Sequence, residues 1–343
     1  MPPMRFGRGR DGTEPEPMRG LLSPAPPAKG VRPTVRPSRT AGLTRGRRLR
    51  RLWRYRWPLL FVSPFFVLFA IFGVYPIAFS LWLSFRDWSL VGAARDVGLD
   101  NFRALRHDDL FWHSMLNSVF LFFIYVPAMT VFAIVLAALL NSRYVRLQGF
   151  WRATIFVPNI MAGTVAAAFT FQLLLDTNSG YANRLLGFVG ASPVPWLDDI
   201  WWARISVGLL VFWAWLGFNM LIMLAGLQAI PPELVESARV DGAGPVQIFR
   251  RITVPLLRPQ IVFSVTLSII GTFQLFTEPY VLTQGGPVRA TETPVLEIQQ
   301  NTFAFLRVGY GAAMSYVFFA AIAVVTLVYL FLVNRRDPWG QAR

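Results

Sequence analysis

Few residues of this chain have the types and spacing that chemistry requires. GRGRDG (7–12) matches the dinucleotide pattern G-x-G-x-x-G, and the only lysine, Lys29, lies apart from any glycine-rich phosphate loop. That pattern needs a strand before it and a helix after it, while a P-loop needs a lysine that reaches the phosphates. Cysteine is absent, and the two histidines, His107 and His113, both lie in one polar stretch. The sequence therefore predicts no catalytic residue, no metal site and no cofactor bound by this chain.

The residues best suited to a functional role form the polar segment ESARVDGAG (236–244), which lies between two long apolar runs. Pro231 and Pro232, which precede this segment, favour a helix over about 232–240. Gly242 favours the left-handed conformation that ends a helix. Pro245 then begins a second short helix, whose predicted apolar face consists of Val246, Phe249 and Ile252. Two short helices with a glycine turn predict a projecting knob instead of a tight connection.

Such a knob has two physical explanations. The helix pair could lie on lipid headgroups, where Arg250 and Arg251 would contact phosphates. Alternatively, it could dock into another protein. Glu233, Glu236 and Asp241 would be repelled by an anionic leaflet, so the acidic first helix favours docking.

The elements that position this knob are membrane helices. The chain is 54% hydrophobic and 15% charged, and its mean hydropathy is +0.46, which is typical of membrane proteins. Each of six segments without a charged residue approaches or exceeds the length that a helix needs to cross a bilayer. We therefore expect an all-α fold with transmembrane helices at 58–83, 117–140, 154–175, 205–227, 260–276 and 311–333.

These predicted spans contain no ionisable residue, which argues against proton- or sodium-coupled transport. The nearest acid is Glu278, which we interpret as a rim residue just beyond the fifth span. A membrane enzyme would need a polar catalytic cluster, and a channel would not need a docking knob. The spans without charge therefore disfavour these classes, and the knob favours docking to a partner protein.

Charge indicates the orientation of the spans. Residues 1–57 hold 15 of the 33 basic residues and only 3 acidic ones, in a Pro-, Gly- and Arg-rich tail that predicts disorder. The segments on the same side as this tail hold 25 basic and 7 acidic residues; they are 1–57, 141–153, 228–259 and 334–343. The loops on the opposite side hold 8 basic and 11 acidic residues; they are 84–116, 176–204 and 277–310. The positive-inside rule places both termini and the knob in the cytoplasm. The basic cluster at 45–57 suits membrane lipid as a partner better than it suits nucleic acid.

Two stretches carry a family resemblance. ESARVDGAGPVQIFRRITVPLLRP (236–259) resembles the coupling loop of binding-protein-dependent ABC importer permeases, with Ser237 in place of a small residue of its Glu-Ala-Ala start. YVLTQGGPVRATETPVLEIQQNTFAFLRVGYGAAMSY (280–316) is similar to the carbohydrate-uptake branch, which includes the maltose and glycerol-phosphate importers. The resemblance covers about 59–333, so only the tail falls outside it.

The resemblance implies a type I ABC importer permease with a cytoplasmic tail (1–57), a six-helix domain (58–333) and a short cytoplasmic tail (334–343). Within a core of about 114–333, the coupling loop (228–259) would dock into a separate cytoplasmic ATPase, which hydrolyses ATP. The implied coupling residues are Glu236, Ala238, Asp241, Gly242 and Phe249. The implied motif on the opposite side consists of Thr283, Gly285, Gly286 and Pro287.

Candidate substrate contacts lie in the fourth and fifth predicted spans. Sugars are bound by aromatic faces and by amide or hydroxyl groups, and Ser268 and Thr272 share one helix face. Packing of the aromatic residues, or bonding of the hydroxyls to their own helix, is an equally open explanation. A Trp-Leu-Gly segment and a polar pair in the maltose importer match Trp215, Gly217, Ser268 and Thr272, which implies a substrate path. Thr272 stands where that relative has an amide.

The predicted function is a permease subunit for a sugar or a similar solute, such as a glycerol phosphate, in the bacterial plasma membrane. Its expected partners are a second homologous permease, cytoplasmic ATPase subunits and an extracytoplasmic solute-binding protein. The alternatives are an ABC permease for a non-sugar solute and, less favoured, a motor-independent transporter or channel. The sequence leaves open which solute is carried and which permease subunit holds most contacts.

Overall fold

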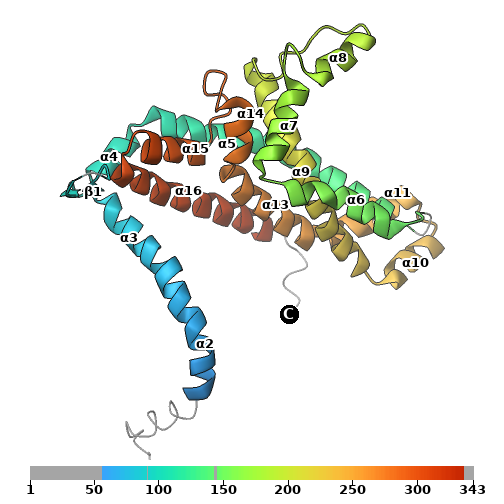
Figure 1. The fold of residues 1–343 in the computed structure, drawn as a ribbon. Helices are drawn as coiled ribbons and strands as arrows, with labels where there is room; N and C mark the ends of the chain where they lie inside the picture. The colour runs from blue at the N-terminus through green and yellow to red at the C-terminus, as the bar shows by residue number, and fades with distance from the viewer. Residues whose placement is uncertain (1–55, 91, 143–144, 336–343) are drawn as a thin grey trace, which may run out of the picture. The chain divides into compact units, whose positions relative to one another are not determined.

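The computed structural model describes residues 56–90, 92–142 and 145–335. In these residues the chain is helical apart from one small hairpin, in which β1 (Arg86–Asp87) pairs antiparallel with β2 (Arg95–Asp96) (Figure 1). The predicted all-α membrane fold is confirmed, with this hairpin as an addition. Most of the predicted tail, 1–55, and residues 336–343 lie outside the described residues.

The first predicted span is a helix with an altered middle. It consists of α2 (Arg56–Phe69), the π-helical turn η1 (Ala70–Val74) and α3 (Tyr75–Ser84). Pro76 lies just after this turn in a helix that continues without a break, and because proline has no N–H it cannot donate the helical hydrogen bond of its position. The chain divides after Pro64, and the helices from Phe65 onward form one compact unit.

Three more long helices, α5 (Asp109–Leu140), α9 (Ile200–Gln228) and α16 (Val308–Arg335), are apolar enough to cross a membrane. Both α5 and α9 begin before the predicted apolar segments because an aspartate caps each N-terminus. Asp108 accepts from two backbone N–H groups at 3.0 and 3.2 Å, and Asp199 does so at 2.9 and 3.1 Å. With the first helix, these make four candidate spans in the described part of the chain, or six if each of two bent helix pairs is counted as one span.

The third predicted span, 154–175, is not the continuous helix that we expected. It consists of α6 (Gln148–Met161) and α7 (Val165–Leu175), which are bent by 97° relative to each other. Gly163 lies in the break with φ of 69°, a conformation that glycine adopts readily. Thr164 then caps α7 by accepting from a backbone N–H at 3.3 Å. Because the break itself is apolar, the hydropathy pattern continued across it.

The knob and the fifth span form a series of short helices. They are α10 (Pro232–Val240), α11 (Pro245–Ile248), the π turn η2 (Phe249–Thr253), α12 (Val254–Leu256) and α13 (Arg258–Phe273). The two predicted short helices are thus confirmed. The segment from α11 to α12 is bent by 63° against α13, and α13 ends before the predicted limit at 276.

The remaining short helices connect the long ones. They are α4 (Asp100–Arg106), α8 (Tyr181–Phe188), α14 (Thr277–Thr283), α15 (Pro294–Gln299) and the π turn η3 (Gln300–Ala304). The helix α14 contacts α7 and α9, while α15 contacts α5 and α16. The segment that carries the LTQGGP sequence is therefore held against the long helices.

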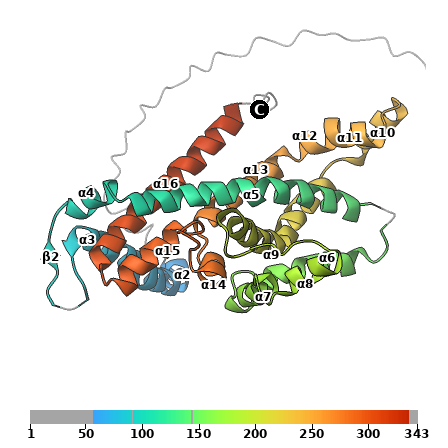
Figure 2. The same ribbon diagram turned by 90° about the horizontal axis from the view of Figure 1, so that it is seen from above.

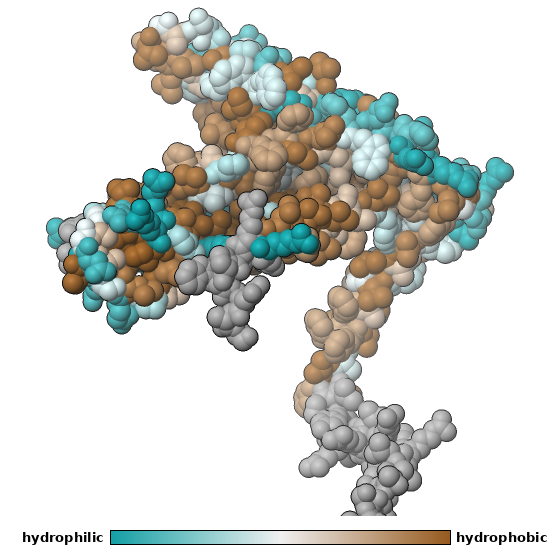
Figure 3. All heavy atoms as spheres, turned by 180° about the vertical axis from the view of Figure 1, so that it is seen from behind, coloured by the Kyte–Doolittle hydropathy of each residue, from teal (hydrophilic) through white to brown (hydrophobic). Residues whose placement is uncertain are grey.

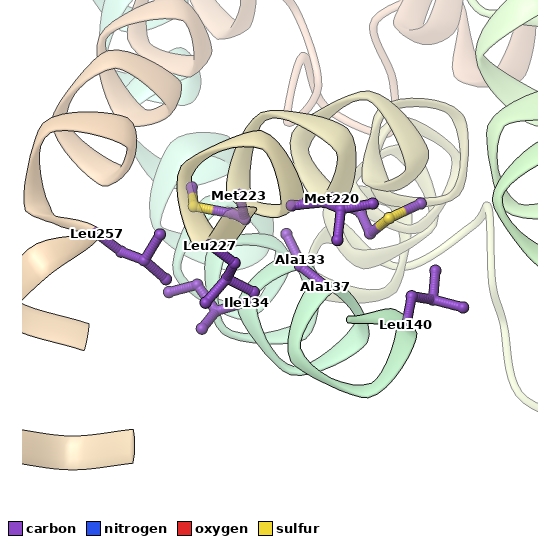
Figure 4. Packing of buried hydrophobic residues seen from close by; sticks show 9 residues of the cluster. Ala133, Ile134, Ala137, Leu140, Met220, Met223, Leu227 and Leu257 are labelled. Carbon is purple, nitrogen blue, oxygen red and sulfur yellow. The ribbon is translucent and has the colours of Figure 1, made fainter. Parts of the chain in front are cut away.

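The core forms where α5, α9 and α13 pack (Figure 2). Ala133 and Ala137 of α5 are fully buried against Met220 and Met223 of α9 (Figure 4). Small residues four apart let two helices approach closely, which is how membrane helices gain packing energy. A further cluster joins α5, α13 and α16 through Phe111, Ile269, Phe273 and Met314.

Large apolar side chains also remain on the surface. Phe72, Phe123 and Phe319 are 76%, 68% and 71% exposed, and apolar residues cover most of the face visible in Figure 3. In water such a surface would be costly, whereas in a bilayer it contacts acyl chains. The surface therefore agrees with a chain that is embedded in lipid.

Candidate functional site

A cavity of about 510 Å³ lies among α5, α9, α13 and the start of α14. Two of the four predicted substrate residues, Trp215 and Ser268, line it. Gly163, from the break between α6 and α7, lines it as well, so the bend in the third span contributes to this cavity. The lining combines aromatic faces with a few hydroxyl, amide and carboxyl groups.

Trp215 is the main aromatic face of the cavity. The residue is 38% exposed, and its ring meets the ring of Phe218 edge to face at 6.0 Å. The backbone carbonyl of Trp215 accepts from Asn219 Nδ2 at 3.0 Å. The Asn219 side chain also accepts from the Ser264 hydroxyl on α13, which fixes its amide at the cavity wall.

Ser268 and Thr272 occupy different environments although they share a helix face. The Ser268 hydroxyl donates to the Ser264 carbonyl at 2.9 Å and lines the cavity. Thr272 is fully buried and is not among the lining residues; its hydroxyl donates to the Ser268 carbonyl at 2.6 Å. Its oxygen also lies 2.5 Å from the hydroxyl of Tyr125, which does line the cavity. Thr272 therefore supports a neighbour of the cavity and does not face it.

Gly217 lies at a helix contact. A Cβ added there would lie 2.2 Å from the Ile155 carbonyl oxygen and 2.8 Å from Phe156 Cα. Any side chain at this position would push α9 away from the backbone of α6. Gly217 thus sets the distance between two helices next to the cavity, and its neighbour Trp215 is the residue that reaches the cavity.

Glu278 is a cavity residue, in contrast to the position predicted from the sequence. We interpreted it as a rim residue, but it is 6% exposed and lines the cavity at the start of α14. Burial raises the pKa of its carboxyl group, and hydrogen bonding with its own backbone lowers the pKa by less. The sequence signal was only its position directly after an apolar span.

The segment TQGGP (283–287) forms a turn that threonine side chains hold. The hydroxyls of Thr283 and Thr291 lie 2.6 Å apart, and Thr291 donates to the Gly286 carbonyl at 2.9 Å. Gly285 has φ of 82°, a value that favours glycine, and the Gly286–Pro287 peptide bond is cis. These predicted motif residues therefore lie together in one turn beside the cavity-lining helix α14.

A buried polar network connects this turn to α5 and α9. Arg204 donates to the Ala290 carbonyl and to Asn117 Oδ1, both at 2.9 Å. Asn117 Nδ2 donates in turn to the carbonyls of Arg289 at 2.8 Å and Glu292 at 3.0 Å. No local sequence pattern predicts this network, because its members are far apart along the chain.

Two buried acids continue the network. Arg289 lies 3.3 Å from Glu292 and 3.5 Å from Glu297, and Asn301 donates to Glu297 at 2.9 Å. Burial, followed by the neighbouring Glu297, raises the pKa of Glu292 from 4.5 to about 7, although Arg289 and Gln300 lower it in part. Glu292 and Glu297 thus share one arginine in a site that is poorly hydrated.

Within the knob, α10 ends at the glycine turn, as predicted. Gly242 has φ of 82°, its N–H donates to the Arg239 carbonyl at 3.0 Å, and Ala243 N–H donates to the Ala238 carbonyl at 2.9 Å. Glu236 and Asp241 are exposed on this helix end. A Cβ at Gly242 would meet nothing within 4 Å, so only its backbone conformation demands glycine.

The second helix of the knob is attached to the bundle through Phe249, a member of the predicted apolar face, and through Ile248, which was not part of that prediction. Ile248 is buried, and Phe249 packs against the core cluster of α5 and α9. Val246 is 71% exposed, so this member of the predicted apolar face lies on the surface of the knob. Leu234 and Val240 of α10 are 44% and 87% exposed. The knob, which projects from the bundle (Figure 2), therefore presents apolar residues beside its acids.

Comparison with known proteins identifies the family. Residues 111–338 match the family model of the "binding-protein-dependent transport system inner membrane component". The lactose transport system permease protein of Rhizobium radiobacter is 36% identical, over 81% of this chain and 94% of that protein. The arabinooligosaccharides permease of Bacillus subtilis is 35% identical (80% and 88%), and the sulfoquinovosyl glycerol permease of Agrobacterium fabrum is 34% identical (81% and 91%).

The fold also has solved counterparts. A chain of a bacterial ABC transporter that imports the acidic polysaccharide alginate matches with a TM-score of 0.74 and 22% identity, covering 85% of this chain and 99% of that chain. At this identity the likeness concerns the fold alone. Together with the sequence matches, it confirms the family resemblance. The chain therefore belongs to the binding-protein-dependent family of ABC transporter permeases: it is a multi-pass inner-membrane permease, not itself an enzyme, and the ATPase is a separate subunit.

Proposed function

We propose that this chain is one permease subunit of an importer for sugars or small oligosaccharides, and that the 510 Å³ cavity is part of the solute's path. The observation that carries this proposal is the combination of groups in the lining. Trp215 offers an aromatic face for sugar C–H groups, while Ser268, Asn219 and Gln274 offer hydroxyl and amide groups. The volume lies within the roughly 300–1,000 Å³ of small-molecule sites.

The relatives support the same class of solute. The lactose and arabinooligosaccharide permeases are similar to this chain over most of its length. Within the proposal, Trp215 and Ser268 contact the solute, whereas Gly217 and Thr272 hold the helices that carry them. A glycerol phosphate or a non-sugar solute has no specific support in the lining.

For the partners, we propose a second homologous permease, two cytoplasmic ATPase subunits and an extracytoplasmic binding protein that delivers the sugar. The knob would face the cytoplasm and dock into the ATPase through Glu236, Ala238, Asp241, Gly242 and Phe249. The exposed Val240 and Val246 support docking, because an aqueous surface gains by covering them. The TQGGP turn would face the opposite side, in agreement with the charge distribution of the loops.

The test is transport by the complete importer in proteoliposomes, with its binding protein outside and ATP inside. Lactose, maltose and arabinobiose are offered together, with leucine as a non-sugar control, and the vesicle contents are measured by mass spectrometry. We expect ATP-dependent accumulation of at least one sugar and none of leucine. Accumulation of leucine alone would contradict the proposed solute class.

A further inference from the structure

We infer that the cavity selects its solute by charge: it admits neutral saccharides and excludes anionic ones, with Glu278 as the specificity-determining residue. This inference rests on the proposed function. The inference goes beyond the proposed function because the relatives' solutes differ in charge. Lactose is neutral, whereas sulfoquinovosyl glycerol carries a sulfonate, and permeases for both are similar to this chain.

In the described part of the chain, the lining contains a single carboxylic acid and no basic side chain. Among the residues that the structure describes, the lining includes neither lysine, arginine nor histidine, and Glu278 is its only carboxylic acid. The other polar lining groups with side-chain hydrogen-bonding atoms are neutral: Tyr125, Trp215, Asn219, Ser268, Gln274 and Thr277. These groups can bond sugar hydroxyls, but none of them can neutralise a carboxylate, phosphate or sulfonate.

Glu278 also lacks a compensating cation in the part of the chain that the structure describes. No ion pair within 4 Å involves it there, although its residue is 6% exposed. The acids Glu292 and Glu297 differ, because both lie beside Arg289. The charge of Glu278 therefore acts on the cavity without a nearby opposite charge.

Both protonation states of Glu278 favour a neutral sugar. Burial raises the pKa of its carboxyl group, so the neutral acid, which can donate to a sugar hydroxyl, becomes more populated. The ionised form accepts from a hydroxyl and repels an anion at short range. A solute anion would itself lose hydration in the cavity without gaining a cation. Exclusion of anions follows from both effects.

The experiment compares matched solutes in the complete importer. Lactose and lactobionate, and maltose and maltobionate, differ by the oxidation of one terminal carbon to a carboxylate. The ratio of aldonate to neutral sugar taken up is measured for the wild type and for Glu278→Gln. The wild type and Glu278→Gln are measured with the same binding protein, so any preference of that protein for one solute cancels when the two ratios are compared. We expect Glu278→Gln to raise the ratio roughly fivefold.

Two controls separate charge in the cavity from charge elsewhere and from misfolding. Asp96→Asn removes an exposed carboxylate of β2, away from the lining, and leaves the ratio unchanged. Gln274 is exposed and lines the cavity, so it tolerates substitution. Gln274→Lys is expected to raise the ratio of aldonate to neutral sugar, and Gln274→Glu is expected to lower it. These two variants test charge selection in the cavity even if Glu278→Gln fails to assemble.

The outcomes are distinguishable from those of the proposed function. If neutral sugar is imported and the ratio does not respond to Glu278→Gln or to the Gln274 variants, charge selection is refuted and the sugar importer stands. If the wild type prefers the aldonates after correction for binding-protein affinity, the inference is also refuted. If no neutral sugar enters with ATP, the proposed function fails, and the inference falls with it.

Discussion

The hydroxyl groups of Tyr125 and Thr272 lie 2.5 Å apart and join α5 to α13 beside the cavity. Thr272 already donates its proton to the Ser268 carbonyl at 2.6 Å. Because a hydroxyl has one proton, Tyr125 must be the donor in this pair. The threonine thus connects the wall residue Tyr125 to the backbone of the wall residue Ser268.

Thr272→Val should therefore destabilise the chain by removing the acceptor of a buried tyrosine. We expect a loss of about 1–3 kcal/mol, because the Tyr125 hydroxyl is left without a partner. Tyr125→Phe should cost less, since Thr272 keeps its bond to the Ser268 carbonyl. In the double variant the loss should be smaller than the sum, which unfolding of the purified chain in detergent can measure. Additive losses would mean that the two hydroxyls are not coupled.

Trp215→Ala should reduce sugar uptake roughly tenfold, corresponding to ~1.4 kcal/mol, without loss of complex assembly. The reason is the removal of the aromatic face that lines the cavity. Trp215→Tyr should restore much of the activity. Trp151→Ala is the matched control, because Trp151 is 47% exposed on α6 and does not line the cavity. Equal uptake by Trp215→Ala and the control would assign Trp215 to packing.

Much of this arrangement could be predicted from local patterns. The short helices of the knob follow from Pro232, Pro245 and Gly242, whose backbone preferences act within a few residues. The approximate spans follow from apolar runs without charged residues, whose lengths are close to the roughly 20 residues that a transmembrane helix needs. Such local preferences do not depend on which other helix is nearby.

Other features depend on contacts that no local pattern contains. Asn117 bonds the backbone at positions 289 and 292, which are 172 and 175 residues away. The burial of Glu278 likewise results from how α14 packs on α7 and α9. Ser268 and Thr272 share a helix face, yet only one of them reaches the cavity, because Tyr125 covers the other.

The buried acid Glu292 should make stability depend on pH. Its folded-state pKa is about 7 against an ordinary 4.5, so between these values the folded state binds more protons than the unfolded state. Stability should then be highest below about pH 4.5 as far as this group is concerned, fall as the pH rises towards 7, and stay low above. Glu292→Gln should remove this decline and raise the melting temperature at pH 8 by about 2–4 °C.

Thermal unfolding in detergent from pH 5 to 8 measures this effect. Arg289 keeps Glu297 as a partner in the variant, so the substitution does not leave an isolated cation. Asp96→Asn, at a side chain that is 71% exposed, is the control for a general change in charge. A Glu292→Gln variant that is less stable than the wild type at pH 8 would contradict the prediction.

Orientation can be tested directly because the chain contains no cysteine. Gln247→Cys on the knob and Gln284→Cys on the TQGGP turn introduce single thiols at exposed positions. In intact cells a membrane-impermeant maleimide should label only Gln284→Cys, and permeabilisation should expose Gln247→Cys. Labelling of Gln247→Cys in intact cells would reverse the proposed topology.

The coupling role of the knob leads to the sharpest prediction. Gly242→Val places a β-branched residue at φ of 82°, where an L-residue costs roughly 1–2 kcal/mol and a β-branched one more. Glu236→Arg reverses an exposed charge on α10. If the knob docks into the ATPase, both variants should reduce co-purification of the ATPase and binding-protein-stimulated ATP hydrolysis, by roughly 5–30-fold for Gly242→Val.

Gly244→Ala is the matched control for the glycine. Gly244 has an ordinary φ of −72°, and a Cβ there meets nothing within 4 Å, as at Gly242. Space is therefore equal at the two positions but the backbone conformation differs, so Gly244→Ala should retain both ATPase binding and stimulation, whereas Gly242→Ala, the same substitution at φ of 82°, should reduce them. If the knob instead rests on an anionic leaflet, Glu236→Arg should be neutral or should strengthen membrane attachment. Retention of the ATPase and of normal stimulation in both Gly242→Val and Glu236→Arg would refute the coupling role.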